Sequence, residues 1–145
     1  MSTSTPWLLY GANGYTGELI AREAVARGMR PVLAGRSKQK IARLAAELNC
    51  PSAVFDLDDH TALCSTLSQV AAVLHCAGPF SHTAPSMMQA CLATHVHYLD
   101  ITGEIDVFEL AASVHAKGQR SAIVLCPGVG FAVVATACVV PRFRE

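Results

Sequence analysis

Short apolar runs alternate regularly with segments of helical periodicity, and this pattern constrains the fold more than any other feature. The apolar runs lie at residues 7–10, 31–34, 53–55, 70–76, 96–100 and 122–126. Between them, apolar residues recur at helical spacing in segments 16–28, 37–48, 59–68, 84–94 and 105–117. Strands that alternate with helices form a mostly parallel sheet covered on both faces. We therefore predict an α/β fold, a doubly wound parallel sheet of six strands in the order 3-2-1-4-5-6.

Capping residues predict where several of these helices begin and end. Gly28 follows the first helix as a stop signal, and Gly118 follows the fifth. Ser37 is a suitable N-cap for the second helix. Thr83 is expected to cap the fourth, with Pro85 in its first turn, where a missing N–H costs little.

Composition excludes two classes of protein. The chain is 52% hydrophobic and 15% charged, which excludes intrinsic disorder. Eleven basic and eleven acidic residues cancel, and no long basic run exists, so nucleic acid is not an expected partner. A length of 145 residues predicts one domain, residues 1–145.

The cysteines and the N-terminus favour a cytoplasmic location. The six cysteines are scattered and most lie in apolar runs, which is typical of free buried thiols in a reducing compartment. The first residues contain no basic n-region, so no signal peptide is expected. Residues 121–141 have the length of a membrane span, but Pro127 and Gly130 interrupt them, which favours a strand, a turn and a short helix.

A glycine-rich loop joins the first strand to the first helix. Its residues are Gly11, Ala12, Asn13, Gly14, Tyr15, Thr16 and Gly17. We expect Gly11 to allow a tight turn, Gly14 to let backbone approach a pyrophosphate, and Gly17 to permit close helix–sheet packing. The following helix N-terminus would offer N–H groups to the phosphates. The spacing is one residue wider than the standard dinucleotide motif, and an ordinary strand–helix turn is the alternative.

The end of the second strand favours NADP(H) over NAD(H). An NAD site expects Asp or Glu there to bind the ribose 2′-OH. This chain has Arg36, followed by Ser37, and a guanidinium can bind a 2′-phosphate. A cation at a helix N-terminus is mildly unfavourable, so an anion is expected to compensate it. A solvated basic helix start is the alternative.

Further polar and glycine-containing segments follow strands three to five. Asp56 either accepts the adenine amino group or caps the next helix. Gly78 would let backbone approach the ribose–nicotinamide half, and Phe80 would wall its ring; Ala77 and Pro79 complete this turn. The segment from Asp100 to Glu104 either faces substrate or nicotinamide, or caps the next helix through Asp100 and Thr102.

The histidines form no metal-binding pattern. His95 and His97 straddle a predicted helix end and strand, and His75 lies in an apolar strand, which is typical of a satisfied core residue. His82 lies in a predicted loop at the ligand edge. No metal is predicted, and no residue is assigned as a proton donor or acceptor.

The combined motifs resemble those of a known family. They are GANGYTG (11–17), AGR (34–36), CAGPF (76–80), AC (90–91), YLDITGE (98–104) and PGVGF (127–131). Over residues 7–138 the chain resembles the N-terminal half of saccharopine dehydrogenase-like oxidoreductases, a group that includes the trans-acting enoyl reductases. The resemblance implies an NADP-binding domain that normally precedes a second, substrate-binding and oligomerising domain.

The chain departs from this pattern in two ways. The family continues well beyond the position of Glu145, so we expect the substrate domain to be absent here. After the last strand the family tends to read G-F-D-x-x-P-x-D, whereas this chain has alanine at 132, 135 and 137. If those acids serve the active site, their loss bears on catalysis. Hydride transfer would then require a further domain, with the substrate unknown.

Two other functions fit the same fold. An extended short-chain dehydrogenase shares the glycine spacing, but its Tyr-x-x-x-Lys pair is missing, because Gly14, Leu19 and Thr102 lie four residues after the three tyrosines. A nucleotide-sensing or interaction domain without turnover is the second alternative.

The apolar segment 131–140 predicts an interface. It reads as a helix that is hydrophobic on every side, and such a helix is normally buried. We expect it to be covered either by the missing domain or by a second copy of the chain, since a net charge of zero does not oppose association.

Overall fold

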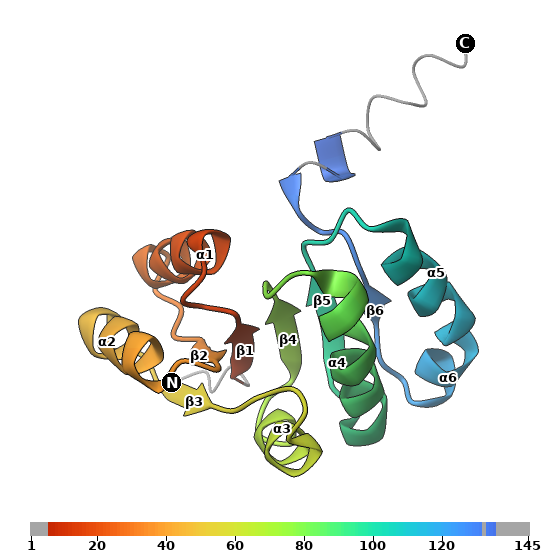
Figure 1. Ribbon diagram of the computed structural model, residues 1–145, viewed down its shortest axis with the longest axis horizontal. Helices are drawn as coiled ribbons and strands as arrows, with labels where there is room; N and C mark the ends of the chain where they lie inside the picture. Colours follow the sequence, from red (N-terminus) through yellow and green to blue (C-terminus); the bar gives the residue numbers. More distant parts are fainter. Residues whose placement is uncertain (1–5, 132, 136–145) are drawn as a thin grey trace.

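The computed structural model describes residues 6–131 and 133–135. Its strands form one six-stranded parallel sheet. The strand order is β3-β2-β1-β4-β5-β6, as predicted (Figure 1). The strands are β1 (Trp7–Tyr10), β2 (Val32–Gly35), β3 (Ser52–Val54), β4 (Ala72–His75), β5 (His97–Asp100) and β6 (Leu125–Cys126).

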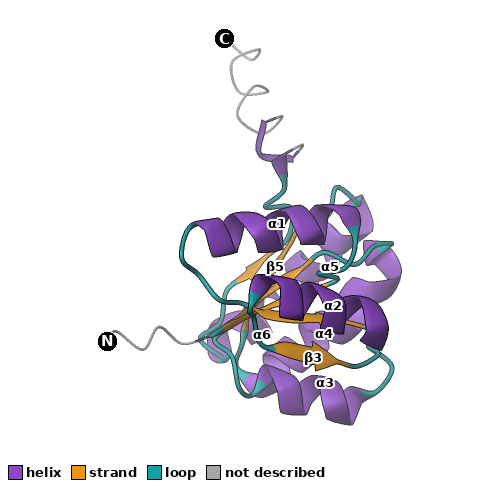
Figure 2. Ribbon diagram, turned by 90° about the vertical axis from the view of Figure 1, so that its left-hand side faces the viewer, coloured by secondary structure: helices purple, strands orange, loops and turns teal. Residues whose placement is uncertain are grey.

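Helices cover the sheet on both faces (Figures 1 and 2). They are α1 (Tyr15–Ala26), α2 (Lys38–Leu48), α3 (His60–Leu67), α4 (Phe80–Thr94), α5 (Ile105–Ser113) and α6 (His115–Arg120). On one face, α1 and α2 enclose Leu9 and Leu33 of the first two strands. On the other, α3, α4 and α5 bury a larger core around Tyr10, Val73 and Tyr98. This coverage explains why the central strands are almost continuously apolar.

The strand register brings the carboxyl ends of the strands to one edge. Tyr10, the last residue of β1, pairs with Ala34 on one side and His75 on the other, and His75 pairs with Asp100. The loops that follow these residues therefore meet at one edge of the sheet. In doubly wound folds this edge binds ligands.

Helix α4 begins earlier than predicted, and its cap is different. It starts at Phe80 after Pro79, so Thr83 lies within the helix and does not cap it. Pro85 also lies inside α4 rather than in its first turn. The first two N–H groups of α4 are instead bound by the carboxylate of Glu104, at 2.7 Å each. This distant cap allows the helix to start directly after the Gly78–Pro79 peptide, which is cis.

The segment after β5 also differs from the prediction. The expected helix over 105–117 is divided at Val114 into α5 and α6, and Gly118 lies inside α6 rather than ending the helix. A Cβ at Gly118 would lie 3.3 Å from Leu125 Cδ1, so this glycine serves close packing against β6. The last strand, Leu125–Cys126, is shorter than the predicted 122–126, and Ala122 lies in a turn with a positive φ of 54°.

The predicted apolar helix over 131–140 falls largely outside the described residues. Within the described part, Phe131 and residues 133–135 are helical, and Phe131 is 90% exposed. The described cysteines, which exclude Cys138, are all free. No helix in the described part has the length and hydrophobicity that crossing a membrane requires.

Candidate functional site

Gly11 forms a tight turn that ties the glycine-rich loop to β2. Its φ is +82°, and its N–H and that of Ala12 both donate to Ala34 O, at 2.8 and 3.1 Å. A Cβ at Gly11 would approach Ala77 N to 2.8 Å. Only glycine accommodates both the positive φ and this close approach.

Gly17 and Gly14 differ in what surrounds them. A Cβ at Gly17 would overlap Gly11 O and lie 2.9 Å from Ala12 Cα, so the close packing that Gly17 permits is between α1 and the glycine-rich loop, rather than the predicted packing of the helix against the sheet. At Gly14 the nearest atom to a Cβ is Gly11 O at 3.3 Å, and φ is −82°. A Cβ at Gly14 would require that carbonyl to move by a few tenths of an ångström, so the fold restricts Gly14 less than it restricts Gly11 or Gly17.

The N-terminus of α1 is open. Gly14 occupies the N-cap position, and none of the side chains that the structure describes caps the helix there. The first N–H groups of an α-helix have no partner within the helix, and the helix dipole makes this end positive. Tyr15 and Thr16 of the first turn are exposed. This end of α1 is therefore suited to hold an anion.

A cleft of about 470 Å³ lies along the glycine-rich loop and the ends of β1, β2 and β4. Seven predicted site residues line it: Gly11, Asn13, Gly14, Arg36, Ser37, Ala77 and Gly78. Three further lining residues were not predicted: Tyr10, Gly35 and Cys76. A Cβ at Gly35 would lie 2.6 Å from Asn13 Oδ1 and would displace the end of that side chain, which also lines the cleft.

Tyr10 and Cys76, which line this cleft, are both neutral near pH 7. Burial raises the pKa of Tyr10 to about 12, with a further contribution from Asp56. Burial also raises the pKa of the Cys76 thiol to about 12, helped by the charge of Asp100. Neither group is activated for nucleophilic or proton-transfer chemistry, which favours a binding role for this cleft.

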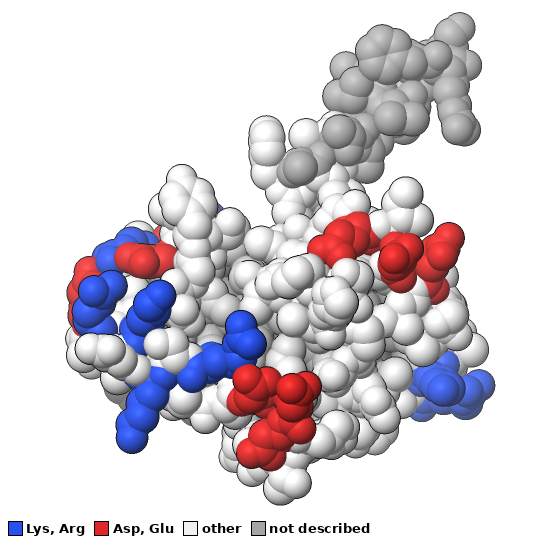
Figure 3. Space-filling model, viewed as in Figure 1, with Lys and Arg blue, Asp and Glu red and all other residues white. Residues whose placement is uncertain are grey.

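Arg36 and Asp56 lie together at a second pocket of about 260 Å³, which adjoins the first. Arg36 is 77% exposed, and its Nη1 lies 4.0 Å from Asp56 Oδ2. Figure 3 shows basic side chains over α1 and α2 and an acidic group where β3 leads into α3. The remaining lining residues are Tyr10, Leu57, Asp58, Ala77, Gly78, Pro79, His82, Thr83 and Ser86.

Asp59, not Asp56, caps α3. Its Oδ1 accepts the N–H of Ala62 at 3.0 Å. Asp56 Oδ1 accepts only the N–H of Asp58, at 3.2 Å. The interpretation of Asp56 as a helix cap is therefore wrong, and its carboxylate faces the pocket that Arg36 lines.

His75 is fully buried and only half satisfied. Its Nε2 lies 2.9 Å from Thr83 Oγ1, while Nδ1 has no hydrogen-bond partner among the described residues. Because Thr83 donates its single hydrogen to Ala77 O or Pro79 O, at 2.7 and 3.0 Å, it must accept from Nε2–H. Burial lowers the pKa of His75 to about 4. The Phe80 ring packs edge-on against His75 at 5.3 Å, where it does not line either pocket described above.

Asp100 is a buried acceptor rather than a helix cap or an exposed ligand contact. Its carboxylate accepts Tyr98 OH at 2.6 Å and the N–H groups of Thr102 and Gly128 at 2.9 and 2.8 Å. The N-cap of α5 is Glu104, whose N–H donates to Thr102 Oγ1. The prediction that Asp100 caps α5 is therefore wrong, whereas Ile101, Thr102 and Gly103 of the same segment line a pocket.

A third pocket, of about 600 Å³ and mainly apolar, lies beyond the glycine-rich loop. Its lining residues are Thr16, Ile20, Leu74, Ile101, Thr102, Gly103, Val129, Gly130, Phe131 and Val133. The predicted residues among them are Thr16 and residues 101–103 of the segment that follows β5. Within the described residues, no three His, Cys, Asp or Glu side chains are placed to hold a metal ion.

Comparison with known proteins identifies related sequences. The model of the family described as "Saccharopine dehydrogenase NADP binding domain" matches residues 7–123. The chain is 25% identical to a saccharopine dehydrogenase-like oxidoreductase of Bos taurus, over 86% of this chain and 34% of that protein. It is 34% identical to a putative trans-acting enoyl reductase of Mycobacterium tuberculosis, over 79% of this chain and 32% of that protein. The chain thus spans about a third of these relatives.

Solved structures share the fold. Apo saccharopine dehydrogenase (L-Glu forming) from Saccharomyces cerevisiae aligns with a TM-score of 0.76 at 16% identity, over 89% of this chain and 28% of that one. AtPrR2 with NADP+ and (+)pinoresinol aligns with a TM-score of 0.62 at 15% identity, over 85% of this chain and 48% of that one. These likenesses concern the fold.

Proposed function

Since this chain belongs to the family of saccharopine dehydrogenase NADP-binding domains, and so is an NADP-binding domain, we propose that it prefers NADP(H) over NAD(H) and serves hydride transfer. The nicotinamide supplies the hydride chemistry when bound. The residues of this chain bind and orient the cofactor, and a further domain binds a small-molecule substrate. The chain spans 34% of its bovine relative, which leaves room in such a protein for that domain.

The surroundings of Gly14, at the N-terminus of α1, carry this proposal. Gly11 and Gly17 are explained by close packing against several atoms of the protein, whereas a single described atom, Gly11 O at 3.3 Å, lies near the position of a Gly14 Cβ. We assign the pyrophosphate to this position. The N-terminus of α4, at the same sheet edge, is already bound by the carboxylate of Glu104. The end of α1 is therefore the better anion site of the two.

Arg36 supports the preference for NADP(H). Within the described part of the chain no side chain caps α2, yet its first turn carries Lys38 and Lys40, next to Arg36. Cations at a helix N-terminus are unfavourable in the absence of an anion. A ribose 2′-phosphate between Arg36 and Ser37 would supply that anion, and Asp56 would accept the adenine amino group.

Replacing Arg36 with alanine is expected to reduce the preference for NADPH over NADH by about ten- to hundredfold. Charged hydrogen bonds to the 2′-phosphate are worth about 1.5–3 kcal/mol, and NADH lacks that group. Fluorescence titration with both nucleotides measures the ratio. Arg30→Ala, which removes an exposed arginine just before β2, is the control and should leave the ratio unchanged. Equal affinities for the two nucleotides in the unmutated chain would exclude the proposed preference.

A further inference from the structure

A chain of hydrogen bonds connects the segments that follow β4, β5 and β6. It begins at the buried carboxylate of Asp100, which accepts the N–H groups of Thr102 and Gly128. The backbone carbonyl of Asp100 also accepts Val129 N–H at 2.8 Å. One residue at the end of β5 therefore holds the segment after its own strand and the segment after β6.

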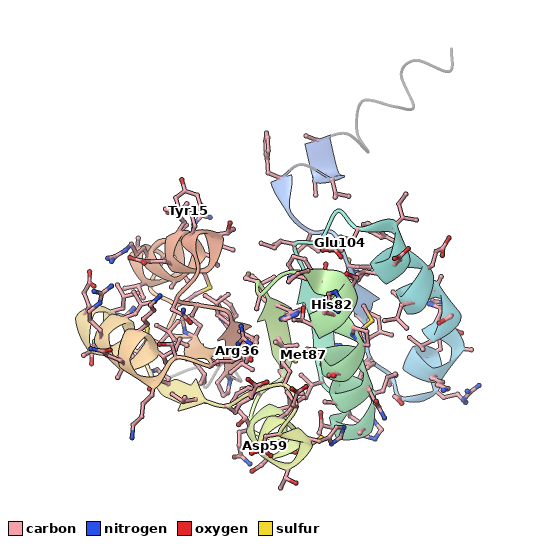
Figure 4. All side chains as sticks on the ribbon, in the orientation of Figure 1. Tyr15, Arg36, Asp59, His82, Met87 and Glu104 are labelled. Atoms are coloured by element: carbon pink, nitrogen blue, oxygen red, sulfur yellow. The ribbon has the colours of Figure 1, made fainter. Side chains whose placement is uncertain are left out.

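Glu104 extends this chain to the segment after β4. It lies four residues beyond Asp100 in the sequence. Its N–H donates to Thr102 Oγ1 at 3.0 Å. Its two carboxylate oxygens each accept one N–H of the first turn of α4, from Phe80 and Ser81. These donors hold the pKa of the Glu104 carboxyl below its usual range, so the carboxylate is charged near neutral pH. Figure 4 shows Glu104 beside the start of α4.

The turn before α4 is held from its other side by Thr83. The Thr83 hydroxyl lies within hydrogen-bonding distance of both Ala77 O and Pro79 O, and His75 supports it from the core. Ala77 and Gly78 line both pockets beside the glycine-rich loop. A shift of this turn would change both pockets, and Glu104 is the only described side chain that binds the N–H groups of Phe80 and Ser81.

We propose that Glu104 is a positioning residue for the cofactor: its carboxylate fixes the Ala77–Phe80 turn and joins it, through Thr102 and Asp100, to the segments after β5 and β6. The three segments then form one rigid rim around the cofactor. This inference rests on the proposed function, since the cofactor is what the rim positions. Glu104 itself does not contact the cofactor; it acts on the cofactor through the Ala77–Phe80 turn.

The test compares Glu104→Ala and Glu104→Gln with a matched control. Asp59→Ala removes another carboxylate cap, from α3, at a distance from Glu104 (Figure 4). Two measurements are made on variants shown to be folded by circular dichroism. The first is the NADPH dissociation constant, by fluorescence titration. The second is amide hydrogen exchange at Phe80, Ser81, Gly128 and Val129.

Glu104→Ala is expected to weaken NADPH binding by about five- to fiftyfold, the effect of losing charged hydrogen bonds that shape the site. Exchange should accelerate at Phe80 and Ser81 and also at Gly128 and Val129. Glu104→Gln keeps one acceptor oxygen and should fall between Glu104→Ala and the unmutated chain. Asp59→Ala should change NADPH affinity by less than about twofold, because its cap does not touch the rim.

The outcomes separate this inference from the function it rests on. Faster exchange at Phe80 and Ser81 with unchanged NADPH affinity would overturn the positioning role and leave Glu104 as a helix cap. Unchanged exchange at Gly128 and Val129 would overturn the link between the segments. Absence of NADPH binding by the unmutated chain would instead refute the proposed function, while the exchange data would still show whether the segments are joined.

Discussion

Replacing Gly14 with valine is expected to abolish NADPH binding, with a loss of at least about a hundredfold, while the chain stays folded. The backbone at Gly14 has a φ of −82°, which any residue adopts, and only Gly11 O lies near the position of a Cβ. The larger side chain would occupy the space assigned to the pyrophosphate. Loss of the charged hydrogen bonds from the end of α1 corresponds to about 3 kcal/mol or more.

Gly17→Ala is the informative comparison, because it should lower the stability of the fold, which Gly14→Val should leave largely unchanged. Its new Cβ would overlap Gly11 O, so the loop must shift, and we expect the free energy of unfolding to fall by about 1–3 kcal/mol. NADPH titration and urea unfolding of both variants separate the two effects. A folded Gly14→Val protein with unchanged NADPH affinity would refute the assignment of the phosphate site.

The free energy of unfolding is expected to fall by about 3 kcal/mol as the pH is lowered from 6.5 to about 4, because of His75. Burial lowers the pKa of His75 from 6.5 to about 4 in the folded chain. Between these values the unfolded state binds a proton that the folded state does not, so stability increases with pH there. Above pH 6.5 both states hold His75 neutral, and its titration does not reduce the free energy of unfolding. Below pH 6.5 the free energy of unfolding falls by about 1.4 kcal/mol per pH unit, until the pH reaches about 4.

Urea unfolding at a series of pH values measures this slope. His75→Leu removes the titrating group from an apolar core position and should flatten the slope between pH 6.5 and 5, above the usual range of carboxyl groups. The exposed His60, replaced by Gln, is the control and should leave the slope unchanged. A slope that persists in His75→Leu would mean that another group carries the pH dependence.

The strand order and the glycine-rich loop could be predicted because their signals are local. Each strand is a short apolar run, and the roles of Gly11 and Gly17 follow from a strand, a turn and a helix that are adjacent in sequence. The start of α4 could not be predicted in this way. Its cap comes from Glu104, which lies 24 residues from Phe80 and meets it only after β4 and β5 pair.

The candidate site shows the same division. Arg36 was predicted from its place after a strand, and it lines the cleft together with the glycine-rich loop. Tyr10 and Cys76 line the same cleft, but in the sequence both belong to apolar runs that predict buried strand residues. The relevant signal was their position at the carboxyl ends of neighbouring strands, where side chains meet at the ligand edge. Asp56 and Asp59 are three residues apart, and only the backbone path decides which of them caps α3.

The contacts within the glycine-rich loop bear on the thermodynamics of ligand association. Gly11 and Ala12 are tied to Ala34 O, and Gly17 packs against Gly11 O, so all of these contacts are made within the protein itself. The loop therefore loses its conformational entropy when the protein folds, and a ligand meets a preorganised surface. The free energy of the phosphate contacts is then available for affinity, with little spent on ordering the loop. Conversely, a substitution that loosens this loop would lower both the stability of the domain and its affinity for the cofactor.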